Sequence, residues 1–206
     1  MRIHLLALAV VTTMTTVAQA DCTSDVNDAF AKLRKSSAFR METKITNPQG
    51  TLTMSNDYVL PDRMHQTVSM NADGPQQMEM ILVGNKAWSN QGNAGWAEVP
   101  DNFASTIAKQ MKETVADAPK DDSKYECLGD VAFEGKTYAA YAAKRAAAPA
   151  TEGAASAGPT VQTVYIDKAL GVPVRNVVTA EADPAKRLFD GTFSVRDGLK
   201  IEPPKL

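Results

Sequence analysis

Apolar and polar residues alternate with a period of two along most of this chain, and this pattern constrains the fold most strongly. Residues 39–45 show it clearly, because hydrophobic residues and Thr43 alternate there with charged residues ahead of a turn at 47–50. No helical segments separate most successive strands, so a parallel sheet is excluded and an antiparallel sandwich or barrel is expected. Further strands are predicted at 51–60, 63–70, 76–83, 86–89, 96–99, 124–128, 131–144 (split at 134–135), 161–166, 172–180 and 189–195.

Two segments instead have helical spacing. Residues 25–36 carry an apolar stripe at every third or fourth position, with Thr23 or Ser24 as the predicted cap and Asp25 in the first turn. Residues 102–115 carry a second stripe, with a cap predicted at Asp101 or Asn102. The sequence therefore predicts a mainly β protein with short helices.

The first twenty residues have the pattern of a signal peptide. Arg2 and His4 form a basic start, an apolar run follows, and residues 18–20 (Ala-Gln-Ala) match a signal-peptidase site. The apolar run is too short to span a membrane, and no lipoprotein cleavage pattern surrounds Cys22. We therefore expect residues 1–20 to be removed, leaving a soluble periplasmic protein without a lipid anchor.

Residues 21–206 are long enough for one domain with a substantial core. Within them, residues 146–159 are rich in Ala, Gly and Pro and contain no large apolar residue. Such a segment buries too little surface to offset the entropy of ordering it, so we expect a mobile insert.

The two cysteines, Cys22 and Cys127, both lie in the exported part. An even pair in an oxidising compartment favours one structural disulfide, which would close a loop of about 105 residues. A catalytic thiol would need a histidine partner, and only His65 lies outside the first twenty residues.

Charge and motifs exclude several function classes. The formal net charge is −2 and basic residues are scattered, so nucleic acid is not an expected partner. No phosphate loop, nucleophile elbow, zinc motif or EF-hand occurs, so neither an enzyme nor a bound metal or cofactor is predicted. His65 lies opposite the methionines of its strand. A solvent-facing or hydrogen-bonded histidine is the simpler interpretation, and a general base or ligand is the alternative.

Methionine is the most notable apolar residue type. Methionines fill irregular cores, line cavities for varied apolar ligands and can bind copper(I) through their thioether sulfur. All three interpretations remain open, although alternation alone explains why Met78 and Met80 share a sheet face. The methionines concerned are Met41, Met54, Met64, Met70, Met78, Met80 and Met111.

Three motifs in order resemble the LolA-like family of exported lipid and lipoprotein carriers, the outer-membrane lipoprotein-sorting and LppX-like superfamily. They are the Pro-x-Arg step in 58–65 (YVLPDRMH), the Gly-x-x-x-Trp step in 81–88 (ILVGNKAW), and the Asp…Gly-x-Pro turn in 165–175 (YIDKALGVPVR). The resemblance extends from about residue 25 to residue 201. The insert at 146–159 and the cysteine pair are not general features of that family.

The resemblance implies an unclosed antiparallel β-barrel, a curved sheet whose concave apolar face is covered by the two helices. It also implies that Arg63 contacts the backbone of this helical lid or a lipid head group; a surface charge is the alternative. A disulfide at Cys22 could pin the first helix, which would favour a sensor or storage protein over a shuttle. The residues expected to line a ligand are Met41, Met54, Met64, Met78, Met80, Leu82, Trp88, Phe103 and Ile107.

Two functions follow as hypotheses. The first is a non-enzymatic periplasmic protein that binds lipids or lipoprotein acyl chains for transport or storage. The second is a sensor or interaction module whose groove is filled by its own side chains and whose partner is a membrane protein. A monomer is assumed in both cases, since the sequence does not determine the oligomeric state.

Overall fold

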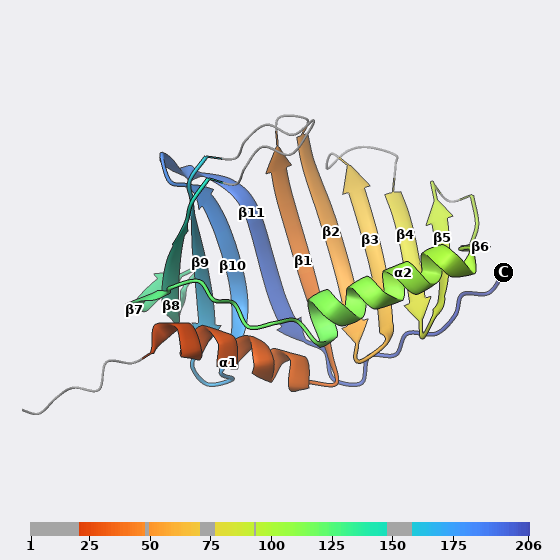
Figure 1. Ribbon diagram of the computed structural model, residues 1–206, viewed down its shortest axis with the longest axis horizontal. Helices are drawn as coiled ribbons and strands as arrows, with labels where there is room; N and C mark the ends of the chain where they lie inside the picture. Colours follow the sequence, from red (N-terminus) through yellow and green to blue (C-terminus); the bar gives the residue numbers. More distant parts are fainter. Residues whose placement is uncertain (1–20, 48–49, 71–76, 93, 148–157) are drawn as a thin grey trace, which may run out of the picture.

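The computed structural model describes residues 21–47, 50–70, 77–92, 94–147 and 158–206. Its centre is one antiparallel sheet of 11 strands, ordered β6-β5-β4-β3-β2-β1-β11-β10-β9-β8-β7 (Figure 1). Because β6 and β7 remain as separate edges, the sheet is curved but not closed, and the expected open barrel is confirmed. The strands are β1 Ala38–Asn47, β2 Gly50–Val59, β3 Arg63–Met70, β4 Gln77–Val83, β5 Lys86–Gln91, β6 Ala97–Glu98, β7 Glu126–Phe133, β8 Lys136–Arg145, β9 Thr160–Asp167, β10 Val172–Ala180 and β11 Asp183–Val195.

The sheet consists of two meanders joined at its middle. Strands β1 to β6 follow one another outward, and the chain then crosses to the opposite edge and returns through β7 to β11. The last strand, β11, pairs with the first, β1, through partners that include Met41 and Phe193. Residues distant in sequence therefore meet at the centre of the sheet.

Helix α1 (Cys22–Lys35) precedes the sheet. Asp21 accepts hydrogen bonds from the backbone N–H groups of Thr23 and Ser24, both at 3.2 Å, so Asp21 is the N-cap and the predicted caps are wrong by two or three positions. The side chains of Val26, Ala29 and Leu33 are buried, as the helical spacing predicted.

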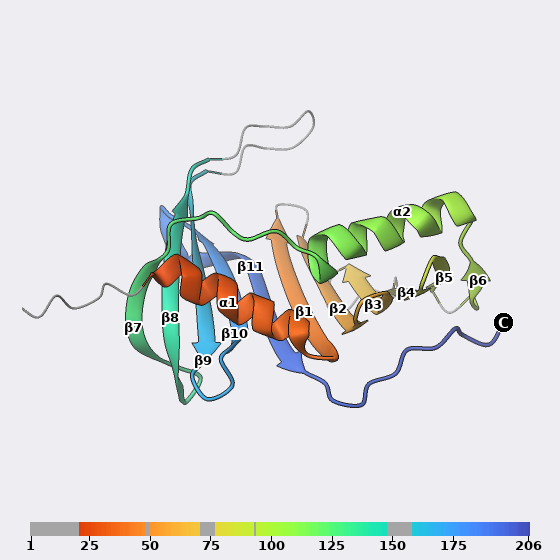
Figure 2. The ribbon, with the colours of Figure 1, turned by 60° about the horizontal axis from the view of Figure 1, so that its bottom comes forward.

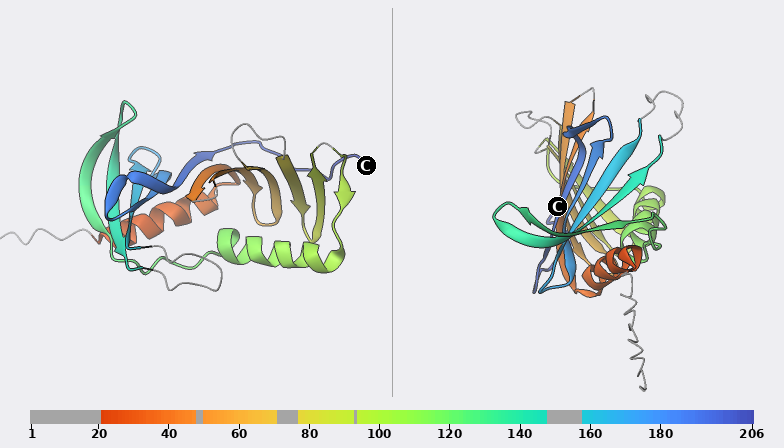
Figure 3. Two further views of the ribbon diagram at one scale, coloured as in Figure 1. Left: turned by 90° about the horizontal axis from the view of Figure 1, so that it is seen from above. Right: turned by 90° about the vertical axis from the view of Figure 1, so that its left-hand side faces the viewer.

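Helix α2 (Asp101–Met111) continues into a π-helical turn, η1 (Lys112–Ala116). Neither Asp101 nor Asn102 caps it, because Pro100 occupies the N-cap position and makes no side-chain hydrogen bond. Both helices lie on the same face of the curved sheet, α1 toward β7–β10 and α2 toward β4 and β5 (Figures 2 and 3). We call this face the inner face and the opposite one the outer face.

The hydrophobic core has two parts on the inner face. One lies beneath the N-terminal part of α1 and combines its Val26 and Ala29 with Tyr125 and Val164. The other combines side chains of α1, α2, strands β1 to β5 and the start of β10, and its buried members are Leu33, Phe39, Tyr58, Met64, Leu82, Ala87, Ala104, Met111 and Val172.

Two expectations fall outside the described residues. The signal peptide predicted at 1–20 lies wholly outside them, and the insert predicted at 146–159 lies largely outside them. Among the described residues, every helix is too short or too polar to cross a membrane.

Candidate functional site

The inner face carries a row of large apolar side chains that the strand register places side by side. Phe39 pairs with Tyr58, Tyr58 with Met64, and Met64 with Leu82, across four adjacent strands. All four side chains are buried, and Leu82 has no exposed surface at all. This row forms the floor beneath the helices.

A first cavity of about 310 Å³ lies between this floor and the second helix. Its volume is at the lower end of the range for small-molecule sites in proteins, which is roughly 300–1,000 Å³. Residues of α2 and η1 face residues of β2, β3 and β4 across it. Its lining consists of Tyr58, Met64, Gln66, Met80, Ile107, Gln110, Met111, Thr114 and Val115.

A second cavity of about 210 Å³ lies where the C-terminal half of α1 approaches η1. It shares Tyr58, Thr114 and Val115 with the first cavity, so the two adjoin across the π-helical turn. Its lining consists of Phe30, Leu33, Arg34, Phe39, Met41, Tyr58, Thr114, Val115, Asn176 and Phe193. The described residues thus form two connected hollows beneath one side of the helical cover.

Tyr58 stands between the two cavities. Its ring packs on that of Phe39, with centroids 5.1 Å apart, while no hydrogen bond to its hydroxyl exists among the described residues. Burial raises the pKa of this hydroxyl to about 12, because the phenolate would be poorly solvated. Tyr58 therefore stays protonated at neutral pH and presents an O–H donor at the junction.

The inner face is less apolar than the methionine pattern indicated. Gln66 donates a hydrogen bond of 2.8 Å to the side-chain oxygen of Asn56, in the row next to the apolar floor. Asn56 is only 3% exposed, and Gln66 lines the first cavity. A hydrogen-bonded polar pair therefore crosses a wall that is otherwise apolar.

Beyond this pair, the inner face continues as an apolar strip toward the ends of the strands away from the helices. Leu52 pairs with Met70, and Val68 pairs with Met54 and Met78. Met70 is 54% exposed and Met78 is 36% exposed. Contiguous apolar surface left open in this way marks a contact site for a ligand or partner more often than single exposed side chains do.

The outer face has a different chemistry. Arg40 makes two hydrogen bonds to Asp57, at 2.7 and 2.6 Å, and Arg175 makes two to Asp190, both at 2.7 Å. A hollow of about 340 Å³ on this side is lined mainly by charged and hydroxyl-bearing residues around the Arg175–Asp190 pair. These two arginines are paired within the fold, so this hollow differs in chemistry from the cavities of the inner face.

Several predicted lining residues lie where a ligand could reach them. Met80 and Ile107 line the first cavity, Met41 lines the second, and Met64 contributes to the first although it is largely buried. Leu82 lies in the core beneath them. Met54 and Met78 share the inner face but lie outside both cavities.

Three predicted residues lie elsewhere. Trp88 lies on the outer face, because it follows inward-facing Ala87 by one position and successive strand residues face opposite sides. Its cross-strand partner is Ile81. Phe103 is 60% exposed. Arg63 donates a hydrogen bond of 2.6 Å to the carbonyl of Ile201, so its partner among the described residues is the C-terminal segment and not the helical lid.

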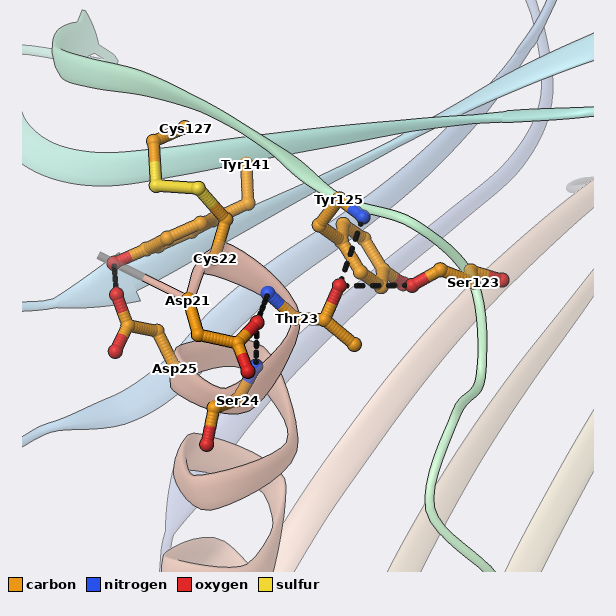
Figure 4. Close-up of a disulfide and its surroundings, with 9 residues drawn as sticks. All are labelled: Asp21, Cys22, Thr23, Ser24, Asp25, Ser123, Tyr125, Cys127 and Tyr141. Atoms are coloured by element: carbon orange, nitrogen blue, oxygen red, sulfur yellow. Dashed lines mark hydrogen bonds between the residues drawn. A yellow bond between two sulfur atoms is a disulfide. The ribbon is translucent and has the colours of Figure 1, made fainter. Parts of the chain in front are cut away.

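The N-terminus of α1 is attached firmly to the far edge of the sheet (Figure 4). The predicted disulfide between Cys22 and Cys127 is present, with Cα atoms 5.4 Å apart. Thr23 donates to the carbonyl of Ser123 and accepts from the N–H of Tyr125, both at 3.1 Å. The first helix is therefore bound covalently and by hydrogen bonds to the segment that leads into β7.

Farther along α1, Asn27 exchanges two hydrogen bonds with the backbone of Asp121, both at 2.8 Å. The Asp121 carboxylate also accepts from the hydroxyl of Tyr125 at 2.9 Å and lies 2.9 Å from Arg145. Burial opposes ionisation of Asp121, but hydrogen bonds from Ser123 and Tyr125 and the charge of Arg145 outweigh it and lower its pKa. This carboxylate thus holds the connection to β7 beside α1.

The described residues hold no group of three or more His, Cys, Asp or Glu side chains placed to bind a metal. His65 lies on the outer face, with its Nε2 atom 3.5 Å from a carboxylate oxygen of Glu79.

Sequence reasoning missed most of the residues that line the two cavities, among them the polar residues Arg34 and Asn176 of the second cavity. Arg34 follows buried Leu33 on α1, and Asn176 occupies an inward position among the valines of β10. A polar residue inside an apolar strand was the available signal for Asn176. Arg34 had no such signal, because basic residues are common in the last turn of a helix.

Comparisons with known proteins identify the fold but no sequence family. No protein-family model matches the chain, and no curated protein matches it in sequence. Among solved structures, LprF from Mycobacterium bovis matches with a TM-score of 0.53 and 11% identity, covering 89% of this chain and 96% of LprF. The Mycobacterium tuberculosis lipoprotein LppX matches with a TM-score of 0.54 and 12% identity, covering 88% of this chain and 98% of LppX. The chain therefore has the LolA-like fold.

Proposed function

We propose that this protein is an exported, non-enzymatic binding protein for lipids or lipoprotein acyl chains, acting in transport or storage in the periplasm. The observation that carries the proposal is the pair of adjoining cavities, the first beneath α2 and η1 and the second between α1 and η1. The walls of the second cavity are mostly apolar, those of the first combine apolar side chains with Gln66, Gln110 and Thr114, and the open strip around Met70 and Met78 extends the same face. An acyl chain fits such a site because it needs apolar surface rather than specific polar contacts.

The energetics support a chain-like ligand. Burying one methylene contributes about 0.8 kcal/mol, so a few buried methylenes already give measurable affinity. Methionine at the wall is suited to this role, because its flexible thioether side chain adapts to ligands of different shape. Met41 and Met80, one in each cavity, are the methionines we assign to it.

The sequence motifs and the fold point to the same class. The motifs resemble those of LolA-like carriers, and the fold is shared with LprF and LppX over nearly their whole length. The disulfide supports an oxidising compartment such as the periplasm, since cytosolic thiols are kept reduced.

A second function, an interaction module that binds a membrane-protein partner, is favoured by one specific observation. Phe103 is 60% exposed on α2, and large aromatic side chains at a surface often anchor protein contacts. In that case side chains of the protein would rearrange to fill the cavities, and no lipid would bind there.

Binding of a fluorescent long-chain fatty acid to the purified protein, together with native mass spectrometry, separates the two functions. The key variant is Met80→Lys, which places a charge in the wall of the first cavity and should reduce binding more than tenfold. Thr67→Lys is the matched control, because Thr67 is on the outer face of the neighbouring strand. It should bind the probe as the wild type does.

Both variants should keep the wild-type thermal midpoint within a few degrees, since Met80 borders a hollow rather than a packed core. A wild-type protein that binds no apolar probe and carries no lipid mass would overturn the lipid-binding function and leave the interaction module. Equal binding by Met80→Lys and the wild type would show that the first cavity is not the site.

A further inference from the structure

The second cavity contains an unpaired positive charge. Arg34 lines it, and no ion pair or hydrogen bond to the Arg34 side chain exists among the described residues. Neighbouring lysines of α1 extend into solvent, whereas the Arg34 side chain is partly buried beside Leu33 and Val115. Burial lowers the pKa of Arg34, although a guanidinium remains charged at neutral pH. A partly desolvated cation without a counter-ion is unfavourable, and an anion placed in the cavity would remove that cost.

Two neutral polar groups of the same cavity also lack partners. The side-chain oxygen of Asn176 is buried and makes no hydrogen bond within the described part of the chain. Rotation of that amide would present its NH₂ group as a donor at the same place. The Tyr58 hydroxyl, which stays protonated, is a further donor without an acceptor.

These three groups stand out because, apart from Thr114, the rest of the cavity lining is apolar. Phenylalanine, leucine, methionine and valine side chains form most of its wall. Buried polar groups in proteins are almost always hydrogen-bonded, so the buried, unpaired oxygen of Asn176 requires an explanation, and it lines the same hollow as the Tyr58 hydroxyl and the partly buried Arg34. A ligand that brings acceptor oxygens and a negative charge would satisfy all three.

We propose that the second cavity is the head-group site of a single-chain amphiphile that ends in a carboxylate, with Arg34 as its counter-ion and Tyr58 and Asn176 as hydrogen-bond donors. The acyl chain then runs past Thr114 and Val115 into the first cavity, which shares these residues. This inference rests on the proposed lipid-binding function and narrows it to a long-chain fatty acid.

Charge balance favours a carboxylate over a phosphate monoester. One guanidinium neutralises one negative charge, and its planar donors match the two oxygens of a carboxylate. A phosphate monoester carries up to two charges near neutral pH, and the cavity lining contains no second cation.

The test compares palmitate, hexadecanol and hexadecyl phosphate as displacers of a fluorescent apolar probe bound to the full-length mature protein. Palmitate should bind the wild type at least tenfold more tightly than hexadecanol, because charged hydrogen bonds are the stronger ones. Hexadecyl phosphate should bind more weakly than palmitate.

The Arg34→Gln variant should lose the preference for palmitate, with affinity falling about 10- to 100-fold while hexadecanol binds as before. Lys35→Gln is the matched control: it removes the same charge from the same helical turn, but Lys35 is exposed and does not line the cavity. Tyr58→Phe keeps the ring and its packing on Phe39, and it should weaken palmitate alone by about three- to tenfold.

If palmitate and hexadecanol bind the wild type equally, or if Arg34→Gln and Lys35→Gln behave alike, the head-group site is wrong although the lipid-binding function stands. In that case the only role of Arg34 is its favourable interaction with the helix dipole at the C-terminus of α1. Tighter binding of hexadecyl phosphate than of palmitate would show that the site prefers a phosphate head group to a carboxylate. If none of the three ligands displaces the probe or binds, the proposed function itself fails.

Discussion

The two helices that cover the inner face are attached to the molecule in very different ways. Helix α1 has an N-cap at Asp21, a disulfide at Cys22 and hydrogen bonds from Thr23 and Asn27 to the segment before β7. In the described part of the chain, α2 has no capping side chain, and its one side-chain bond to the rest of the fold is that of Asp101 to Lys86. That pair is more than half exposed, and such pairs contribute little.

The packing differs in the same direction. Three residues of α1 are buried, whereas α2 buries only Ala104 and Met111 and exposes Phe103. Both cavities border η1, at the end of α2, and the second also borders α1. From this difference we expect α1 to act as a fixed wall and α2 to be the more mobile part of the cover. A ligand would therefore pass beneath α2, and η1 is the place where α2 can pivot.

Removal of the disulfide should cause the largest loss of stability. It should also make the attachment of α1 much more like that of α2. Replacing both Cys22 and Cys127 by Ser is expected to lower the free energy of unfolding by about 4–5 kcal/mol, because the bond closes a loop between residues 105 apart. Denaturant unfolding measures the change, and hydrogen exchange locates it. The amides of α1 should lose protection while those of α2 change little; a loss confined to α2 would contradict the assignment of α1 as the fixed wall.

Truncating one inward-facing side chain in each helix should lower the free energy of unfolding by unequal amounts. Leu33→Ala in α1 should cost about 3 kcal/mol, because Leu33 is 2% exposed in the core. Ile107→Ala in α2 should cost only about 1 kcal/mol, since Ile107 is half-buried beside an existing hollow. Equal losses in denaturant unfolding would show that α2 packs as tightly as α1.

The N-cap of α1 should matter more than the corresponding acidic residue of α2. Asp21→Ala removes two hydrogen bonds to the first turn and should cost about 1 kcal/mol. Asp101→Ala removes an exposed pair and should cost about 0.3 kcal/mol. Thermal unfolding of the two variants side by side measures the difference, and a larger loss for Asp101→Ala would contradict the comparison.

Acid should weaken the attachment of α1 slightly and leave α2 unaffected. The pKa of Asp121 is lowered in the folded protein, so its contribution is fully present above the unfolded value near 3.8 and is lost as the pH falls below it. Stability should therefore decline below about pH 4, and Asp121→Asn should show a smaller decline. Hydrogen exchange at about pH 3.5 should report the change in α1; an acid effect that is the same in Asp121→Asn would show that other carboxylates cause it.

The sequence predicted the sheet well because strand alternation and turn residues are local signals. The predicted strand at 63–70 coincides with β3, and that at 172–180 coincides with β10. Helix starts were predicted less well, because an N-cap depends on the backbone angles at one residue. Pro100 occupies the α2 N-cap position although its side chain offers no hydrogen-bond acceptor.

The candidate site could be predicted only in part. Alternation identifies which residues share a face of the sheet, so it grouped Met41, Met64 and Met80, which all lie on the inner face. Trp88 is out of step with this pattern by one residue and lies on the outer face. Whether an inward residue meets a helix, a cavity or solvent depends on where the helices lie over the sheet. That placement is a tertiary property, so the sequence did not distinguish buried Met64 from exposed Met78.

The pairing of β11 with β1 has a consequence for how the protein is made. Thr43, in the first strand of the chain, pairs with Gly191 in the last, so the centre of the sheet cannot form until nearly the whole polypeptide is available. Until then β1 and β10 each present an unpaired edge, the kind of surface on which chains aggregate. Folding dominated by such distant pairings is slow. Newly made chains therefore pass through an interval in which they are prone to aggregate, and a chain truncated before Asp183 would never complete the sheet.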